Sequence, residues 1–339
     1  MDLTLEQLQG MTDTQVWEMV RQALLQVVFA GDSRLSPVFI ASTILIALAL
    51  WLARRPGEGF WAWLFPRRVY RTKSFWVDVK LWLTGGVLRV LGLFSMLAFA
   101  PLLADRIQVF LAGDQSPQSS WPPILIGLIL FATSDFVGYW VHRLFHERPR
   151  LWPFHALHHS AEQLNPITVA RKHPVYDIFA AIARALLTGL VQGLLLGLVV
   201  GSVDIATIMG ANLFYYAFNL AGANLRHTHI WLSWGPVAEH VLISPAQHQV
   251  HHSIDPVHFD KNYGEVLAIW DWAFGTLYVP RGDEKLEFGL ADQKGRRIAQ
   301  PHDSWRSAMI EPFTASFNRS RRRSRAAAGR LTSQSADPD

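Results

Sequence analysis

The stretch from Pro122 to Ser160 reads PPILIGLILFATSDFVGYWVHRLFHERPRLWPFHALHHS. Residues 122–141 are apolar enough and long enough to cross a bilayer as a helix. Five of the 14 histidines of the chain follow within the next eighteen residues. The sequence therefore predicts a membrane-spanning helix whose end carries a dense cluster of imidazole groups.

The composition of the chain favours an integral membrane protein. Of its 339 residues, 50% are hydrophobic, 17% are charged and 14 are tryptophan, which is too apolar for an ordinary soluble enzyme. The chain has no cysteine, so any metal must be held by nitrogen and oxygen ligands. The net charge of +4 comes with basic residues gathered in residues 54–73 and 318–325. These runs are typical of juxtamembrane anchors and a solvated tail, and we expect no nucleic-acid partner.

Apolar segments predict five membrane crossings, and the basic loop after the first of them gives the orientation. By the positive-inside rule this loop is cytoplasmic, and five crossings then place every histidine cluster on the cytoplasmic side. The predicted fold is an all-α membrane bundle of four or five transmembrane helices with a cytoplasmic helical cap that carries the metal ligands. The expected crossings are Ser36–Ala53, Leu81–Leu103, Pro122–Val141, Ile178–Val200 and Ile205–Ala221.

We expect four regions along the chain. Residues 1–120 hold an amphipathic helix over Leu3–Ala30, which lacks a signal-peptide pattern, and the first two crossings. Residues 121–280 form the catalytic domain. Residues 281–317 form a cytoplasmic C-terminal segment, and residues 318–339 form a basic disordered tail.

Three histidine motifs have the spacing of side chains on one helical face. In HRLFH the two histidines are four residues apart, one helical turn. In HALHH and in HQVHH the three histidines follow an i, i+3, i+4 pattern. The residues are His142 and His146, then His155, His158 and His159, then His248, His251 and His252.

The number of clustered histidines indicates two metal ions. A histidine taken alone is more often a satisfied core or interface residue than a ligand. Imidazoles at close quarters, however, repel one another when protonated, and a bound cation gives eight of them a common reason to stay neutral. Eight ligands exceed what one transition metal accepts. Neighbours such as His158 and His159 differ by about 100° around a helix, so each can face a different ion.

The order of these motifs resembles the fatty acid hydroxylase and sterol desaturase superfamily of membrane histidine-box di-iron oxygenases. The resemblance covers residues 124–280 and includes SDFVGYWVHR, TVARKHP and NYGEVLAIWDWAFGTLY, which lie around the three motifs. It implies two iron ions as cofactor, O2 as co-substrate and the motif histidines as iron ligands.

The resemblance also implies a further ligand before the last motif, in NLRHTHIWLSWG. One branch of the superfamily has a histidine there, followed two residues later by a glutamate. That comparison places His227 at the ligand position and His229 at the glutamate position, as a possible additional ligand. Which of the two binds metal stays open. His240, His258 and His302 are interpreted as ordinary polar residues.

No residue is assigned as a catalytic acid, base or nucleophile, but five are candidates to orient the ligands. Asp135 lies seven residues before His142, on almost the same side of the helix, so it can accept the free N–H of a ligand imidazole. Alternatively it pairs with Arg184 or is protonated. His173 is an orienting or a structural candidate. The resemblance alone adds Asn224, Asn262 and Asp271, which are otherwise cap or turn residues.

The expected function is O2-dependent oxidation of a lipid. Redox-active iron can break an unactivated C–H bond, whereas zinc has no redox chemistry. We therefore expect hydroxylation or desaturation of a sterol, fatty acyl or related lipid. The sequence has no flavin, haem or iron–sulfur motif, so electrons come from a separate reductase, ferredoxin or cytochrome.

Two other classes of protein compete with this interpretation. A membrane metallohydrolase would bind zinc, but the sequence has no HExxH motif. A metal transporter would place its ligands near mid-membrane on broken helices, whereas these motifs lie at the ends of apolar segments. The lipid, the position of attack, the electron donor and the oligomeric state stay open.

Overall fold

The computed structural model describes residues 36–91, 99–113, 119–210 and 212–318, together with residues 12, 14–15, 17–18 and 21. Most of the predicted helix over Leu3–Ala30 and the predicted tail from residue 319 onward lie outside these residues. Helices dominate the described part of the chain, and backbone pairing between extended segments is limited there to isolated bridges. The predicted all-α class is confirmed.

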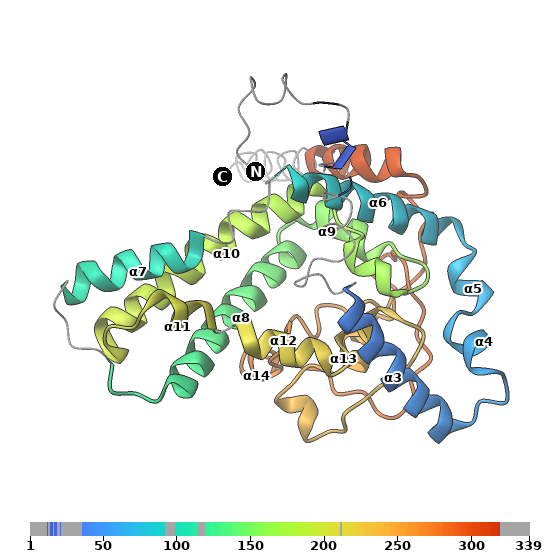
Figure 1. Ribbon diagram of the computed structural model, residues 1–339. Coiled ribbons are helices and arrows are strands. Elements are labelled where there is room, and N and C mark those ends of the chain that lie inside the picture. The colour runs from blue at the N-terminus through green and yellow to red at the C-terminus, as the bar shows by residue number, and fades with distance from the viewer. Residues whose placement is uncertain are drawn as a thin grey trace, which may run out of the picture.

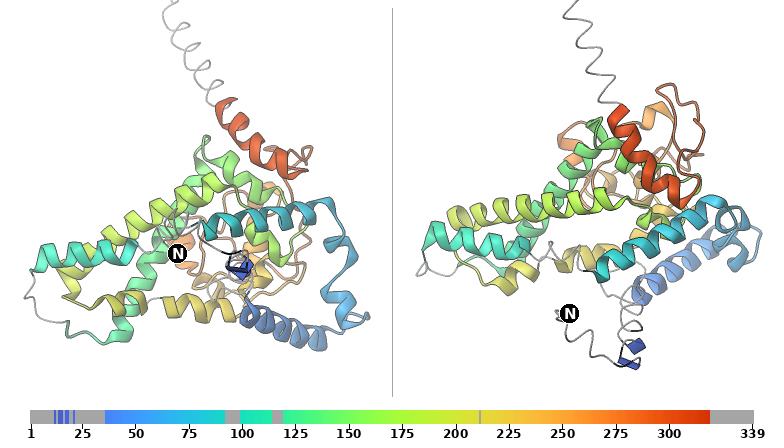
Figure 2. Two further views of the ribbon diagram at one scale, coloured as in Figure 1. Left: turned by 45° about the horizontal axis from the view of Figure 1, so that its top comes forward. Right: turned by 90° about the horizontal axis from the view of Figure 1, so that it is seen from above.

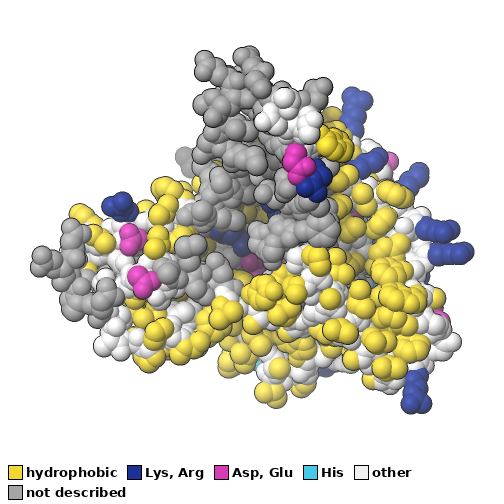
Figure 3. Space-filling view, in the orientation of Figure 1, with side chains coloured by type: hydrophobic (Ala, Val, Ile, Leu, Met, Phe, Trp, Pro, Cys, Tyr) yellow, Lys and Arg dark blue, Asp and Glu magenta, His cyan; other side chains and the backbone are white. Residues whose placement is uncertain are grey.

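Three helices in the described part are long and apolar enough to cross a membrane: α3 (Pro37–Arg54), α8 (Pro123–Glu147), and α10 (Pro174–Leu195) with the π-helical turn η3 (Leu196–Val200). Each begins with proline in its first turn, where the missing N–H costs no helical hydrogen bond. They match three of the five predicted crossings, and their outer faces expose large apolar side chains such as Leu45, Leu128 and Leu190. Figure 3 shows hydrophobic side chains over much of the visible face.

The other two predicted crossings correspond to pairs of shorter helices. The segment Leu81–Leu103 falls on α6 (Lys73–Val90) and α7 (Phe99–Ala112), and Ile205–Ala221 falls on α11 (Ile205–Gly210) and α12 (Asn212–Leu220). In both cases residues between the paired helices lie outside the described ranges, namely 92–98 and 211. The total of four or five crossings therefore stays a prediction.

Helix α6, which includes the start of the second predicted crossing, also packs against the helices of the cap. Its buried Val77 and Leu81 pack against Leu157 of α9 (Trp152–His159) and Ala308 of the helix over residues 305–318. Figures 1 and 2 show α6 beside that C-terminal helix, whereas α7, α10 and α11 extend to the other side of the molecule. Leu81 therefore belongs to a core shared with α9 and the C-terminal helix, and the crossing expected to begin there stays a prediction.

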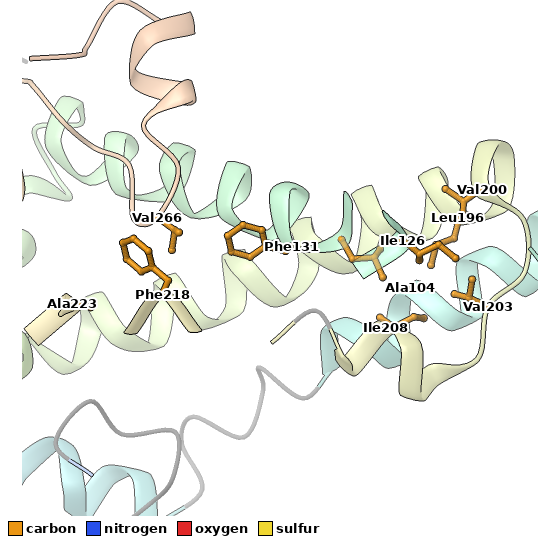
Figure 4. Packing of buried hydrophobic residues seen from close by; sticks show 11 residues of the cluster. Ala104, Ile126, Phe131, Leu196, Val200, Val203, Ile208, Phe218, Ala223 and Val266 are labelled. Carbon is orange, nitrogen blue, oxygen red and sulfur yellow. The ribbon is translucent and has the colours of Figure 1, made fainter. Parts of the chain in front are cut away.

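A continuous apolar core connects the membrane helices to the cap. It runs along α8 from Ile126 to Phe131 and then to Phe218 of α12 and Val266 (Figure 4). The side chains at its far end come from η3 and α11. Helix α8 therefore carries the packed core at one end and His142 and His146 at the other.

Helices α7 and α10 approach each other along a stripe of glycines with four-residue spacing, Gly189 and Gly193 on α10 and Gly197 on η3. A Cβ atom added to Gly193 would lie 2.6 Å from Ile107 Cβ and 2.9 Å from the carbonyl oxygen of Ala104. Small residues with this spacing let two helix backbones pack closely in a membrane. The stripe explains why a helix as short as α7 is held firmly against α10.

We expect Gly193→Val to separate α7 from α10. Forcing a branched side chain into this contact should destabilise the fold by about 1–3 kcal/mol, as overpacking generally does. The thermal unfolding midpoint in one detergent measures the effect. Gly85→Val in α6 is the matched control, because nothing lies within 4 Å of a Cβ atom there. Equal shifts in the two variants would contradict the packing argument.

The cap is built from short helices and loops around the end of α8. Helix α13 (Pro245–His251) begins with a capping box, in which the Ser244 hydroxyl accepts from Gln247 N and the Gln247 side chain accepts from Ser244 N. It packs against the 3-10 helix η4 (Ala223–His227), and η4 contacts η2 (Pro166–Ala170). Helix α14 (Ile269–Ala273) follows residues 266–267, whose backbone is hydrogen-bonded to Asp135 of α8. The short helices α4 (Phe60–Leu64) and α5 (Arg67–Tyr70) connect α3 to α6.

Candidate metal centre

Nine buried or nearly buried histidines converge in two adjacent groups. Within each group, one nitrogen atom of every ring lies within 4.8 Å of those of the others. The first group combines α8, α9 and α13, and the second combines α9, η4 and α13. The first group is His142, His146, His155, His159 and His251, and the second group is His158, His227, His248 and His252.

Helix geometry explains how neighbours in sequence enter different groups. His158 and His159 are consecutive on α9, and His251 and His252 are consecutive at the end of α13. Consecutive side chains point about 100° apart around a helix. In each of the two pairs one ring therefore joins the first group and the other joins the second, so that α9 and α13 each contribute to both groups.

The ring nitrogens approach too closely and too often for ordinary hydrogen bonding. The Nε2 atoms of His227, His248 and His252 are 3.1–3.3 Å from one another. A nitrogen of a neutral imidazole is either an N–H donor or a lone-pair acceptor. In a triangle of three such atoms, at least one contact must join two donors or two acceptors. A cation at the centre removes this conflict, because all three nitrogens can then direct lone pairs at it.

The spacing of the nitrogens fits first-row transition metals. A metal about 2.1 Å from each nitrogen would separate neighbouring nitrogens by about 3.0 Å in an octahedral arrangement and about 3.4 Å in a tetrahedral one. The Nε2 atom of His155 lies 3.0 Å from that of His142 and 3.2 Å from that of His159. The second group has the same spacing, so both groups fit such an ion.

Burial favours the neutral form of six of the clustered histidines. Burial lowers the pKa of His155, His158, His159, His248 and His251 well below the usual value, and the charge of neighbouring imidazoles lowers it further. Burial also lowers the pKa of His252 to about 3. Metal binding requires a deprotonated ring nitrogen. These rings therefore bind a cation without first releasing a proton.

Two backbone carbonyls of one loop orient rings of the first group. The Nδ1 atom of His142 donates to the carbonyl oxygen of Tyr263, and that of His251 donates to the carbonyl oxygen of Lys261, both at 2.8 Å. Each ring consequently presents its Nε2 lone pair to the other histidines. Hydrogen bonds of this kind fix the tautomer and raise the basicity of a metal ligand.

Asn262 and Asp271 hold this loop in place. Asn262 has a φ of 56°, a conformation that asparagine tolerates better than most residues. Its Nδ2 atom donates to the carbonyl oxygens of Gln247 and Tyr278. The Asp271 carboxylate accepts from Tyr263 N at 2.8 Å and Gly264 N at 2.7 Å. Both therefore hold the backbone of residues 261–264, whose carbonyls accept from His142 and His251.

His229 does not join either group, in contrast to its inclusion among the predicted metal ligands. The 3-10 helix η4 ends at His227, and Thr228 has extended backbone angles. The His229 side chain turns toward the connection between α3 and α6, where its Nε2 atom donates to the carbonyl oxygen of Trp63 at 2.7 Å. Of His227 and His229, only His227 is a member of the second group.

Within the described residues Asp135 has no hydrogen bond to a histidine and no ion pair with Arg184, so both expected pairings are wrong. Its carboxylate accepts from Val266 N at 3.1 Å, Leu267 N at 2.9 Å and Trp270 Nε1 at 3.2 Å. Arg184 pairs instead with Glu265. Asp135 therefore anchors residues 266–270, which follow the loop of residues 261–264, to α8.

His173 and Asn224 have different positions relative to the groups. The Nδ1 atom of His173 accepts from Val175 N at the start of α10, and its Nε2 atom donates to the carbonyl oxygen of Met309. This arrangement supports the structural alternative for His173, because its ring joins α10 to the C-terminal helix. Asn224 is buried on η4, three residues before His227.

A cavity of about 430 Å3 reaches both groups from the cap. His146, His159 and His251 of the first group and His252 of the second line it. Trp152 and His302 line it too, and neither is a candidate site residue from the sequence. The loop carbonyls of Lys261 and Tyr263 were also missed. The motif that contains Asn262 and Asp271 pointed to this loop, but no sequence signal shows that a backbone carbonyl faces a ligand.

The fold and the site define a class: an all-α membrane protein in which nine histidines from distant segments form a two-part buried cluster. Residues 127–276 match the family model Fatty acid hydroxylase. The match covers 150 of the 339 residues, and this region is similar to the fatty acid hydroxylase superfamily.

Curated relatives match about half of the chain. It is 32% identical to an alkylglycerol monooxygenase of Danio rerio over 52% of this chain and 35% of the relative. It is 29% identical to the ornithine lipid hydroxylase OlsE of Rhizobium tropici, over 53% of this chain and 51% of the relative. It is 25% identical to the very-long-chain aldehyde decarbonylase CER1 of Arabidopsis thaliana, over 45% of this chain and 23% of the relative. The chain thus spans between a quarter and a half of the length of these relatives. No solved structure matches it.

Proposed function

We propose that the protein is a membrane di-iron monooxygenase that hydroxylates a lipid with O2 and externally supplied electrons. The observation that carries this proposal is the division of nine buried histidines into two adjacent groups with metal-like nitrogen spacing. The names of the relatives add support, since alkylglycerol monooxygenase and ornithine lipid hydroxylase both denote oxygen insertion into a lipid. They favour hydroxylation over desaturation for this chain.

The protein would hold one ion in each group. Two iron ions, when bound, supply the redox chemistry that activates O2 toward a C–H bond. The chain itself would position the histidine rings and shield the centre from water. Residues 261–263 fix the rings of His142 and His251, and the burial of all the ligand rings but the slightly more exposed His146 keeps water from the centre. The described residues place no carboxylate in either histidine group, so the proposed chemistry does not use a protein acid or nucleophile there.

The test is isotope incorporation by the purified protein. Protein in lipid nanodiscs would be loaded with Fe(II) and supplied with 18O2, a chemical reductant, and a panel of alkylglycerols, ornithine lipids, sterols and fatty acids. We expect one 18O atom in the product lipid, identified by mass spectrometry. Zinc-loaded protein is the control and should be inactive. Oxygen-independent turnover with zinc would instead identify a hydrolase.

Metal content gives a second prediction. We expect two iron ions per chain by elemental analysis, and removal of iron by a chelator should abolish turnover. A ligand that binds only the folded state stabilises it in proportion to the logarithm of its free concentration over its Kd. The thermal unfolding midpoint should therefore fall on chelation and recover when Fe(II) is restored. A stoichiometry of one iron, or no thermal shift, would contradict the two-ion site.

Asp271→Ala tests the support of the first group. Loss of this carboxylate leaves the backbone N–H groups of Tyr263 and Gly264 without their acceptor, and the carbonyl that orients His142 should shift. We expect iron affinity to fall about 10- to 100-fold, as for other residues that orient metal ligands. Asp292→Ala is the matched control, because Asp292 also accepts two backbone N–H groups, from Lys294 and Arg296, but in an exposed loop. Unchanged affinity in Asp271→Ala would refute the role.

A further inference from the structure

The cavity beside the histidine groups lies entirely within the cap. Its walls come from the end of α8, from α9 and α13, from residues 253–260, and from the C-terminal segment 289–315. Its volume of about 430 Å3 lies within the range of small-molecule sites. The ring of Trp152 forms part of the wall, 5.0 Å from the His146 ring and 5.4 Å from the His159 ring. A group that fills the cavity would therefore lie directly against the ligand rings.

The charged residues around the cavity are all acidic. Glu147, Asp260 and Glu311 line it, and none of the described lining residues is lysine or arginine. None of these carboxylates is free: Glu147 pairs with Arg143, Asp260 accepts from the Tyr263 hydroxyl, and Glu311 also has an interaction within the protein. A phosphate or carboxylate entering the cavity would meet negative charge without a cationic partner within the lining, which is costly in a partly dry site. A hydroxyl or an amine would meet hydrogen-bond acceptors.

His302 supplies a polar contact in the cavity that the fold does not use. Its side chain is 2% exposed, and neither ring nitrogen has a hydrogen-bond partner within the described part of the chain. Its backbone is fixed, because His302 N donates to the Gln300 side chain and its carbonyl accepts from Arg171. Burial, together with the charge of Arg171, lowers the pKa of His302 to about 3. A neutral imidazole offers one donor and one acceptor, which complements a hydroxyl or an amine.

We propose that this cavity binds the polar end of the lipid substrate, that His302 hydrogen-bonds it, and that the site selects hydroxyl- or amine-bearing ends over carboxylate or phosphate ends. The inference rests on the proposed lipid hydroxylation. It adds that the oxidised carbon lies within a few bonds of the polar end, because the cavity adjoins the histidine groups.

The test measures binding separately from turnover. Three amphiphiles with one twelve-carbon chain, dodecan-1-ol, dodecylamine and dodecanoate, would be titrated at pH 7 into the metal-free and the iron-loaded protein in zwitterionic nanodiscs. We expect saturable binding of the alcohol and the amine at least about 10-fold tighter than that of dodecanoate. His302→Phe should weaken alcohol binding about 10-fold, since it removes a buried hydrogen bond, and His302→Asn should restore part of it.

Blocking variants show whether the probes bind in this cavity. Ala315→Trp places a large ring in the cavity wall, whereas Thr314→Trp alters the adjacent exposed position of the same helix. Saturable binding should disappear in the first variant and persist in the second. Equal or tighter binding of dodecanoate, or binding that survives Ala315→Trp, would overturn the inference. Selective binding without 18O incorporation would uphold the cavity assignment and refute the oxygenase instead.

Discussion

His227→Ala is expected to remove one of the two iron ions and to abolish hydroxylation, whereas His229→Ala, two residues away, should retain both ions. The Nε2 atom of His227 lies 3.3 Å from that of His158, 3.2 Å from that of His252 and 3.1 Å from that of His248. Each of the other three rings of the second group therefore has a nitrogen atom within 3.3 Å of His227 Nε2. Its removal leaves three ligands around a vacated corner.

The expected loss of turnover for His227→Ala is on the order of 1000-fold, because a catalytic metal contributes several kcal/mol to transition-state stabilisation. His229→Ala loses only the hydrogen bond to the Trp63 carbonyl, which should cost about 1 kcal/mol of folding stability. Elemental analysis and 18O incorporation measure both variants under the same conditions. Iron loss in His229→Ala with retention in His227→Ala would show that His229, and not His227, is the ligand.

This pair also shows what the sequence could and could not predict about the site. The i, i+4 and i, i+3, i+4 spacings predicted that the histidines within each motif share one side of a helix, because the motifs lie on α8, α9 and α13, where helical geometry fixes the side-chain directions. His227 and His229 lie at the end of a 3-10 helix. The turn at Thr228, whose hydroxyl donates to the Leu225 carbonyl, sends the two rings in opposite directions. No periodicity in the sequence reports such a turn.

Long-range packing explains the other differences. The helical position of Asp135 relative to His142 was correctly inferred, but the partner at that level of α8 is the backbone of residues 266–267, more than 130 residues away in sequence. Leu81 has the hydropathy of a membrane residue, yet it is buried against α9 and the C-terminal helix. Hydropathy reports that a side chain avoids water and does not distinguish lipid from a protein core.

Arg171→Ala is expected to unfold the cap around α9. Arg171 and Asp78 form an ion pair at 2.7 Å, and both side chains are fully buried. The guanidinium also donates to the Leu157 carbonyl and the Ser160 hydroxyl at the end of α9, and to the carbonyl of Ser74 on α6. Asp78 accepts in addition from Asn165 and Thr168 beside η2. One side chain therefore joins α6, α9 and η2 behind the histidines of α9.

Removing one partner of a buried ion pair leaves the other charge uncompensated, which typically costs about 3–5 kcal/mol. We expect Arg171→Ala to lower the free energy of unfolding by that amount, to raise hydrogen exchange of α9 amides and to release iron. Arg296→Ala is the control, because its ion pair with Asp292 is largely exposed and should contribute less than about 1 kcal/mol. The double variant Asp78→Leu, Arg171→Met removes both charges and should recover part of the stability. If Arg171→Ala left the exchange of α9 amides and the iron content unchanged, the ion pair would not hold the histidines of α9 in place.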